Sequence, residues 1–147
     1  MTFLLVKTSN KPSSQLQNQK IGERCVFDVV GDMLKESPFA IKGDYGYTPL
    51  GAVVGATHPE ELRQLRSSLE GCFFLIPGYG AQGGSADDAT QGFDARGLGA
   101  AVNSSRGVIY AFGEEEDYGV KIAEAAQKSR DDLNAALERA GKKYWEV

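Results

Sequence analysis

The sequence predicts an α/β fold in which short parallel strands alternate with amphipathic helices. Two observations support this prediction. Nearly continuous apolar runs, typical of strands buried on both faces, recur along the chain. Between them lie segments with apolar residues at helical spacing. Strands and helices that alternate in this order form a parallel sheet with right-handed crossovers. No low-complexity linker divides the 147 residues, so we expect residues 1–147 to form one domain.

Residues that favour helix ends and turns set the limits of the predicted elements. Pro59 is suited to the first turn of a helix, Ser85 with an acid three positions on forms a capping box, and Gly141 closes the last helix. A polar stretch, 11–22, is expected to be loop or weak helix, and 37–49 to be loop. The predicted strands are 3–7, 51–56, 72–76 and 98–102, and the predicted helices are 24–35, 59–69, 85–93 and 117–140, with a turn or short helix at 108–112.

Composition excludes several classes of function. With a net charge of −4, the chain lacks the excess of basic residues that is typical of nucleic-acid-binding proteins. No apolar run reaches the length of a membrane span, and the first residues are too short for a signal peptide. Cys25 and Cys72 have no metal-type spacing and are expected to be reduced thiols of a cytoplasmic protein rather than a disulfide. His58 is the only histidine, so no His-rich metal site and no triad based on another histidine can form.

The segment Leu75-Ile76-Pro77-Gly78-Tyr79-Gly80-Ala81-Gln82-Gly83-Gly84 is the most informative motif. It joins a predicted strand to a helix start through a glycine-rich loop, where backbone N–H groups can point outward and bind an anion such as phosphate. The glycines could instead serve only turns with positive φ, although the two interpretations are compatible. Gln82 could contact a phosphate or pyrimidine, or could bond to the local backbone. Asp87 and Asp88 would repel a phosphate, so we expect their side chains to point away from it.

Arg106 follows the next predicted strand in the run Asn103-Ser104-Ser105-Arg106-Gly107. Its guanidinium is a planar, permanently charged fork that matches phosphate oxygens. A surface salt bridge is the ordinary alternative. Two consecutive strands that end in groups able to bind phosphate are typical of the last two strands of a (β/α)8 barrel.

These motifs together resemble orotidine 5'-phosphate decarboxylase. The resemblance rests on the PGYGAQGG loop, the NSSRG strand end, the run from Val53 to Leu62 and the run from Leu4 to Asn10. It covers about residues 3–112 and is closest to the longer bacterial branch of the family. It implies the second half of a TIM barrel, with strands 5–8 in four βα units.

The family resemblance also implies an activity and roles for single residues. The family converts orotidine 5'-monophosphate to uridine 5'-monophosphate in pyrimidine biosynthesis, without cofactor or metal, and places its sites across a homodimer interface. Ser9 would contact the pyrimidine edge, although a cap or turn hydroxyl is an equal alternative. Gln82, Gly83 and Arg106 would bind the phosphate. His58 would be structural or lie at the rim of the site, with a general base as the alternative.

The sequence departs from the family pattern at the catalytic residues. The family's catalytic Lys and carboxylates come from Asp-x-Lys-x-x-Asp on the third strand, and no such motif occurs here. Lys42-Gly43-Asp44 is not assigned that role. We therefore expect a truncated barrel that binds substrate, has no catalytic residue of its own, and associates as a homodimer or with a complementary half. The alternative is a non-catalytic nucleotide-binding half-barrel that self-associates. The acidic run from Glu114 to Asp117 is expected to be solvated, and Tyr144 and Trp145 to anchor the C-terminus.

Overall fold

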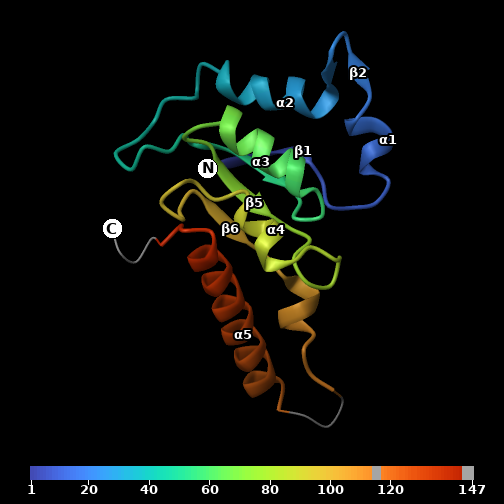
Figure 1. Ribbon diagram of the computed structural model, residues 1–147, viewed down its shortest axis with the longest axis vertical. Coiled ribbons are helices and arrows are strands. Elements are labelled where there is room, and N and C mark those ends of the chain that lie inside the picture. Colours follow the sequence, from blue (N-terminus) through green and yellow to red (C-terminus); the bar gives the residue numbers. More distant parts are fainter. Residues whose placement is uncertain (114–116, 144–147) are drawn as a thin grey trace.

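A parallel sheet forms the centre of the protein in the computed structural model, which describes residues 1–113 and 117–143 (Figure 1). Its order is β1-β4-β5-β6, and each neighbouring pair is parallel. The strands are β1 (Thr2–Lys7), β4 (Leu50–Val54), β5 (Phe73–Ile76) and β6 (Ala100–Val102). The predicted alternation of strands and helices in a parallel sheet is confirmed.

Helices follow each strand of the sheet and begin where the sequence signals predict. In α4 the Ser85 Oγ accepts the Asp88 N–H, which is the predicted capping box. The Asp117 side chain caps α5, and Gly141 follows that helix with φ of 70°. The helices are α1 (Ser13–Gln17), α2 (Val26–Lys35), α3 (Pro59–Ser68), α4 (Ala86–Thr90) and α5 (Tyr118–Arg139), with a π-helical turn η1 (Ser105–Ile109).

Two elements, α2 and β6, begin two residues later than predicted, because a short hairpin precedes the first and glycines with positive φ precede the second. The stretch from residue 24 starts as β3 (Arg24–Cys25), which pairs antiparallel with β2 (Lys20–Ile21) through a turn at Gly22, where φ is 63°. Strand β6 starts only at Ala100 because Gly97 and Gly99 both have a φ of 76° and interrupt the extended chain.

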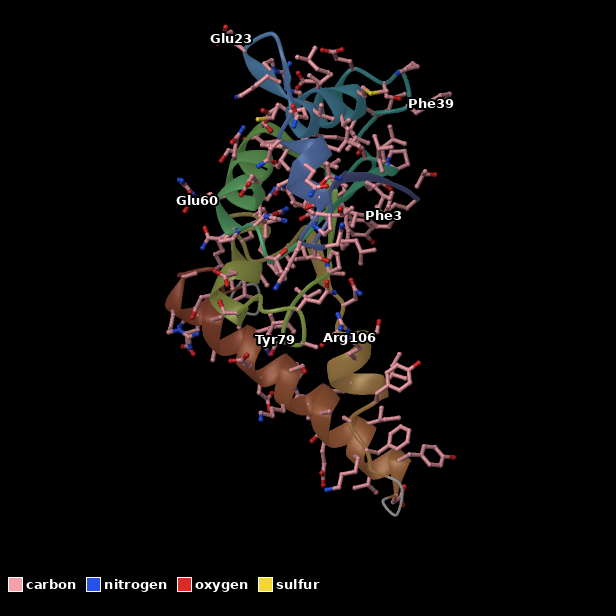
Figure 2. All side chains as sticks on the ribbon, turned by 90° about the vertical axis from the view of Figure 1, so that its right-hand side faces the viewer. Phe3, Glu23, Phe39, Glu60, Tyr79 and Arg106 are labelled. Atoms are coloured by element: carbon pink, nitrogen blue, oxygen red, sulfur yellow. The ribbon has the colours of Figure 1, made fainter. Side chains whose placement is uncertain are left out.

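Within residues 1–113 and 117–143, helices cover only one face of the sheet. Phe74 and Ile76 point to this face and pack in the core with Leu62 and Leu65 of α3. On the opposite face, Leu5, Val53, Leu75 and Ala101 form one register layer across the four strands. Leu5 in this layer is 62% exposed. Layers of alternating strand residues fill the interior of a (β/α)8 barrel, so this uncovered face corresponds to a barrel interior. Figure 2 shows Phe3, from the next layer, pointing away from the helices.

Helix α5 is only partly packed against the rest of the protein. Its predicted apolar stripe is buried at Ala136 and Leu137, whereas Val120 is 51% exposed. Figure 1 shows the N-terminal half of the helix running away from the sheet beside η1. None of the described helices is long and apolar enough to cross a membrane. The predictions for Glu114 to Glu116, and for Tyr144 and Trp145, lie outside the described residues.

Candidate functional site

The carboxyl ends of the strands bring the predicted binding residues together. Ser9 follows β1 and Gln82 lies in the loop after β5, 73 residues further along the chain. Their side chains meet, with Ser9 Oγ donating to Gln82 Oε1 at 3.1 Å. The Thr57 hydroxyl, after β4, donates to the Ser9 carbonyl at 3.1 Å. The loops after three neighbouring strands therefore form one continuous site.

The backbone of the glycine-rich loop closes on itself. Gly80 N–H donates to the Gly84 carbonyl and Gly83 N–H to the Gly80 carbonyl, each at 2.8 Å, and Gly84 N–H donates to the Gly78 carbonyl at 3.0 Å. The expectation that the N–H groups of these glycines point outward is therefore wrong, because a tight turn uses them internally. Among the described residues, the N–H groups of Ala81 and Gln82 have no acceptor. The loop offers these two groups to an anion.

Arg106 lies across a small opening from Gln82. The opening has a volume of about 50 Å³ between the glycine-rich loop and the start of η1. The Arg106 side chain is exposed, and it makes no ion pair with any residue in the described ranges. Figure 2 places Arg106 beside Tyr79, at the end of the sheet where η1 begins. The residues around the opening are Gly78, Tyr79, Ala81, Gln82, Asn103, Ser104, Ser105 and Arg106.

A larger cavity, of about 380 Å³, adjoins this opening at Gln82. Ser9 and Gly83 line it together with Gln82, and His58 and Lys11 line it as well. Gln82 is therefore shared by the two spaces, one with Ser9 and the other with Arg106. All the predicted binding residues line one or both of the spaces.

The two acids after the glycine-rich loop behave differently. Asp87 points away as expected, because its carboxylate accepts from Arg139 of α5 at 2.8 Å. Asp88 lines the larger cavity and does not line the opening beside Arg106, so its position agrees with the expectation that it stays away from a phosphate. Its carboxylate accepts from the Ser85 backbone N–H at 2.9 Å and from the Ser85 hydroxyl at 2.7 Å. Completing the capping box keeps Asp88 beside the loop.

Tyr79 joins the glycine-rich loop to α5, a contact that the sequence did not predict. Its hydroxyl donates to Asp132 at 2.7 Å. Burial, together with this bond, raises the pKa of Tyr79 to about 12. No local pattern announces this contact, because the two residues are 53 positions apart and neither belongs to a recognisable motif.

Lys42 lies at the amino ends of the strands, whereas the site lies at their carboxyl ends. Its side chain contacts Gly71, which precedes β5, so it lies beside the amino ends of the strands. His58 lies at the start of α3, and its Nε2 is 3.3 Å from Ser13 Oγ. Burial and then the nearby Lys7 ammonium lower the pKa of His58.

Comparison with known proteins connects this geometry to one enzyme family. No family model matches the sequence. The orotidine 5'-phosphate decarboxylases of Rhodopirellula baltica and Clostridium kluyveri are 45% and 43% identical to this chain, over 78% and 89% of its length. The chain spans only 38% and 46% of those two proteins, and the matched region is their C-terminal part.

Solved structures agree with the sequence comparison. The chain superposes on Leishmania donovani UMP synthase with a TM-score of 0.74 and 36% identity, covering 91% of this chain and 27% of that one. It superposes on Leishmania donovani OMP decarboxylase with a TM-score of 0.71 and 32% identity, covering 91% of this chain and 47% of that one. A putative orotidine-monophosphate-decarboxylase from Plasmodium yoelii, at 21% identity and a TM-score of 0.77, shares the fold. The partial barrel predicted from the sequence is confirmed.

Proposed function

We propose that this chain, which is similar over most of its length to the C-terminal part of orotidine 5'-phosphate decarboxylases, is the phosphate-binding half of such an enzyme. The observation that supports this proposal is the position of Gln82 between Ser9 and Arg106. The Gln82 side chain therefore lies beside both spaces. A nucleoside monophosphate has two groups to place in them, a base and a phosphate.

In this proposal the chain contributes binding rather than the reacting groups. Arg106 and the free N–H groups of Ala81 and Gln82 hold the phosphate, and Ser9 and the Gln82 side chain hold the pyrimidine edge. Contacts remote from the reacting bond accelerate a reaction when they hold the substrate in its reactive position. The charged groups that act at the pyrimidine belong to the other half of the barrel, on an Asp-x-Lys-x-x-Asp motif.

A second candidate function is non-catalytic binding of a nucleotide. The observation that favours this candidate is that Ser9, Gln82 and Arg106 lie together in this chain, because these groups would bind a nucleotide without any reacting group. Both candidates share the binding site and differ in turnover.

For either function we propose the cytoplasm as the compartment. Cys25 and Cys72 are both unpaired, and burial raises the pKa of the Cys72 thiol to about 11, which keeps it protonated and unreactive.

Replacing Arg106 by Ala should weaken the binding of uridine 5'-monophosphate and leave the binding of uridine unchanged. A guanidinium–phosphate contact stabilises a complex by about 1.5–3 kcal/mol, so the nucleotide should bind roughly ten- to a hundredfold more weakly. Gln82→Ala should weaken both ligands by the same, smaller factor, because its side chain holds the pyrimidine edge and the loop N–H groups that hold the phosphate remain. Calorimetric titration of both ligands measures the two effects.

Arg63→Ala is the matched control for this experiment. Arg63 is also an exposed arginine, but it pairs with Glu60 on α3, outside the two site cavities. Its substitution should leave both affinities unchanged. Equal losses of nucleotide and nucleoside in Arg106→Ala would show that Arg106 supports the fold and does not bind phosphate.

The uncovered sheet face should make the isolated chain associate, either with itself as a homodimer or with a complementary half-barrel. Parallel sheets are normally covered on both faces, and open strand edges invite pairing. At micromolar concentration the chain should sediment faster than a monomer. Leu5→Lys should weaken association, because Leu5 lies on this face and is 62% exposed.

Met33→Lys is the control for Leu5→Lys. Met33 is equally exposed, at 62%, but it lies on α2, on the covered side of the sheet. This substitution should leave the sedimentation unchanged. A monomeric profile for the unsubstituted chain, with no binding of an apolar dye, would argue against the assembly.

A further inference from the structure

The turn that carries Ser9 (residues 8–13, the Ser9 turn) is fixed by one side chain within it and by one that follows it in the chain. The Thr8 N–H donates to Gln17 Oε1 at 3.0 Å, and the Thr8 hydroxyl donates to Asn10 Oδ1 at 2.6 Å. Neighbouring backbone also fits closely around the turn. A Cβ on Gly55 would lie 2.7 Å from the Ser9 Cα. The position of the Ser9 hydroxyl is therefore imposed by its surroundings.

His58 contacts both ends of the Ser9 turn. Its Nε2 is 3.3 Å from the Ser13 hydroxyl, and the Thr8 backbone lies close enough to the imidazole to raise its pKa. Since the Thr8 N–H is used by Gln17, the Thr8 group able to accept from the ring is its carbonyl. A neutral imidazole has one donor and one acceptor nitrogen. It can therefore donate to Thr8 and accept from Ser13 at the same time.

The backbone of His58 is held at the junction of β4 and α3. Its backbone N–H donates to the Gly55 carbonyl at 3.2 Å, and Pro59 begins the helix directly after it. His58 also lines the larger cavity with Ser9 and Gln82. A ring anchored in this way, beside Thr8 and Ser13, lies along the turn whose hydroxyl meets Gln82.

We propose that His58 is a positioning residue for pyrimidine recognition, which acts by holding the Ser9 turn in the conformation that presents the Ser9 hydroxyl. This inference rests on the proposed function, because the pyrimidine is the ligand that Ser9 would contact. It assigns His58 neither proton transfer nor a direct contact with the substrate.

The charges around the ring keep it neutral. Burial and then the Lys7 ammonium lower the pKa of His58, whereas Glu61 and the Thr8 bond raise it by less. Lys7 is itself buried, and its Nζ donates to Asn18 Oδ1 at 2.7 Å and to Ser14 Oγ at 3.2 Å. Lys11 and Asp88 also line the cavity beside the ring.

This lowered pKa fixes the sign of its effect on stability. The unfolded chain binds a proton near the ordinary value of 6.5, and the folded chain does so only at lower pH. The contribution of His58 to stability is therefore present above pH 6.5, and it is lost as the pH falls through the folded pKa.

The test compares His58→Phe with His58→Gln. Phe keeps a ring and removes both hydrogen bonds, whereas Gln keeps a donor and an acceptor. His58→Phe should weaken uridine and uridine 5'-monophosphate by the same factor, about tenfold, because one oriented hydrogen bond at the base is lost. His58→Gln should retain most of the affinity. Arg106→Ala should give the opposite pattern, with loss of nucleotide binding alone.

Ser13→Ala provides a second variant that leaves the ring in place. It removes one of the two contacts, so it should weaken both ligands equally and by less than His58→Phe. This variant decides the question if His58→Phe does not fold. Unchanged affinities in Ser13→Ala and His58→Phe would overturn the inference, as would equal losses in His58→Gln and His58→Phe.

Nuclear magnetic resonance separates this inference from the proposed function. The chain has a single histidine, so its imidazole signals are unambiguous. His58 should titrate below 6.5, Lys7→Met should raise its pKa, and amide exchange at residues 8–13 should quicken in His58→Phe. If the unsubstituted protein binds no nucleotide while these changes occur, the proposed function fails and the contacts of His58 stand. If it binds nucleotide and exchange is unchanged, the positioning role is wrong.

Discussion

The 147-residue chain alone should give no measurable conversion of orotidine 5'-monophosphate to uridine 5'-monophosphate. Turnover should appear when the chain is combined with a half-barrel that carries Asp-x-Lys-x-x-Asp. Enzymes lower reaction barriers by about 8–23 kcal/mol, and most of that reduction requires groups placed at the reacting atoms. Ser9, Gln82 and Arg106 place no cation at a scissile bond. Release of carbon dioxide from carboxyl-labelled substrate measures the rate.

The control for this experiment is the same complementary half with its motif Lys replaced by Ala. It should assemble with the chain and bind nucleotide, and it should restore no turnover. The opposite result is equally informative. Turnover by the purified chain alone, and its loss in Lys42→Ala, would assign catalysis to a residue at the other edge of the sheet and would overturn the division of roles proposed here.

Local signals in the sequence predicted the elements and part of the site. Pro59, the capping box at Ser85 and the glycine after α5 each act within a few residues of the helix end that they define. The carboxyl ends of parallel strands share one edge, so residues after successive strands had to converge. Ser9 and Gln82 did so, and they meet at 3.1 Å.

Contacts between distant segments could not be predicted in the same way. The pairing of β1 shifts register between Leu5 and Lys7, and as a result Val6 and Lys7 are both buried. Strict alternation would have placed Lys7 on the opposite face from Val6. Whether a glycine N–H points outward also depends on the closure of the whole loop, which composition does not determine. Gly83 shows this, since its N–H is used by Gly80.

Gly78→Ala should disturb the site more than any other small substitution in the glycine-rich loop. Gly78 has a φ of 95°, and an added Cβ would lie 2.8 Å from the Ser9 Cβ and 3.3 Å from Thr57 Cγ2. The methyl group therefore strains the backbone and pushes against the Ser9 turn. We expect a loss of about 2–4 kcal/mol in the free energy of unfolding, from conformational strain and overpacking together.

Gly22→Ala is the matched control, because it separates the two causes. Gly22 has a φ of 63°, and an added Cβ there meets no atom within 4 Å. It should lose about 1 kcal/mol through backbone strain alone and keep its affinity for uridine. Urea unfolding and uridine titration, in the assembled barrel where the half alone is too unstable, measure both quantities. If Gly78→Ala lost no more stability than Gly22→Ala and bound uridine equally well, the close fit between the glycine-rich loop and Ser9 would not be what orients the Ser9 hydroxyl.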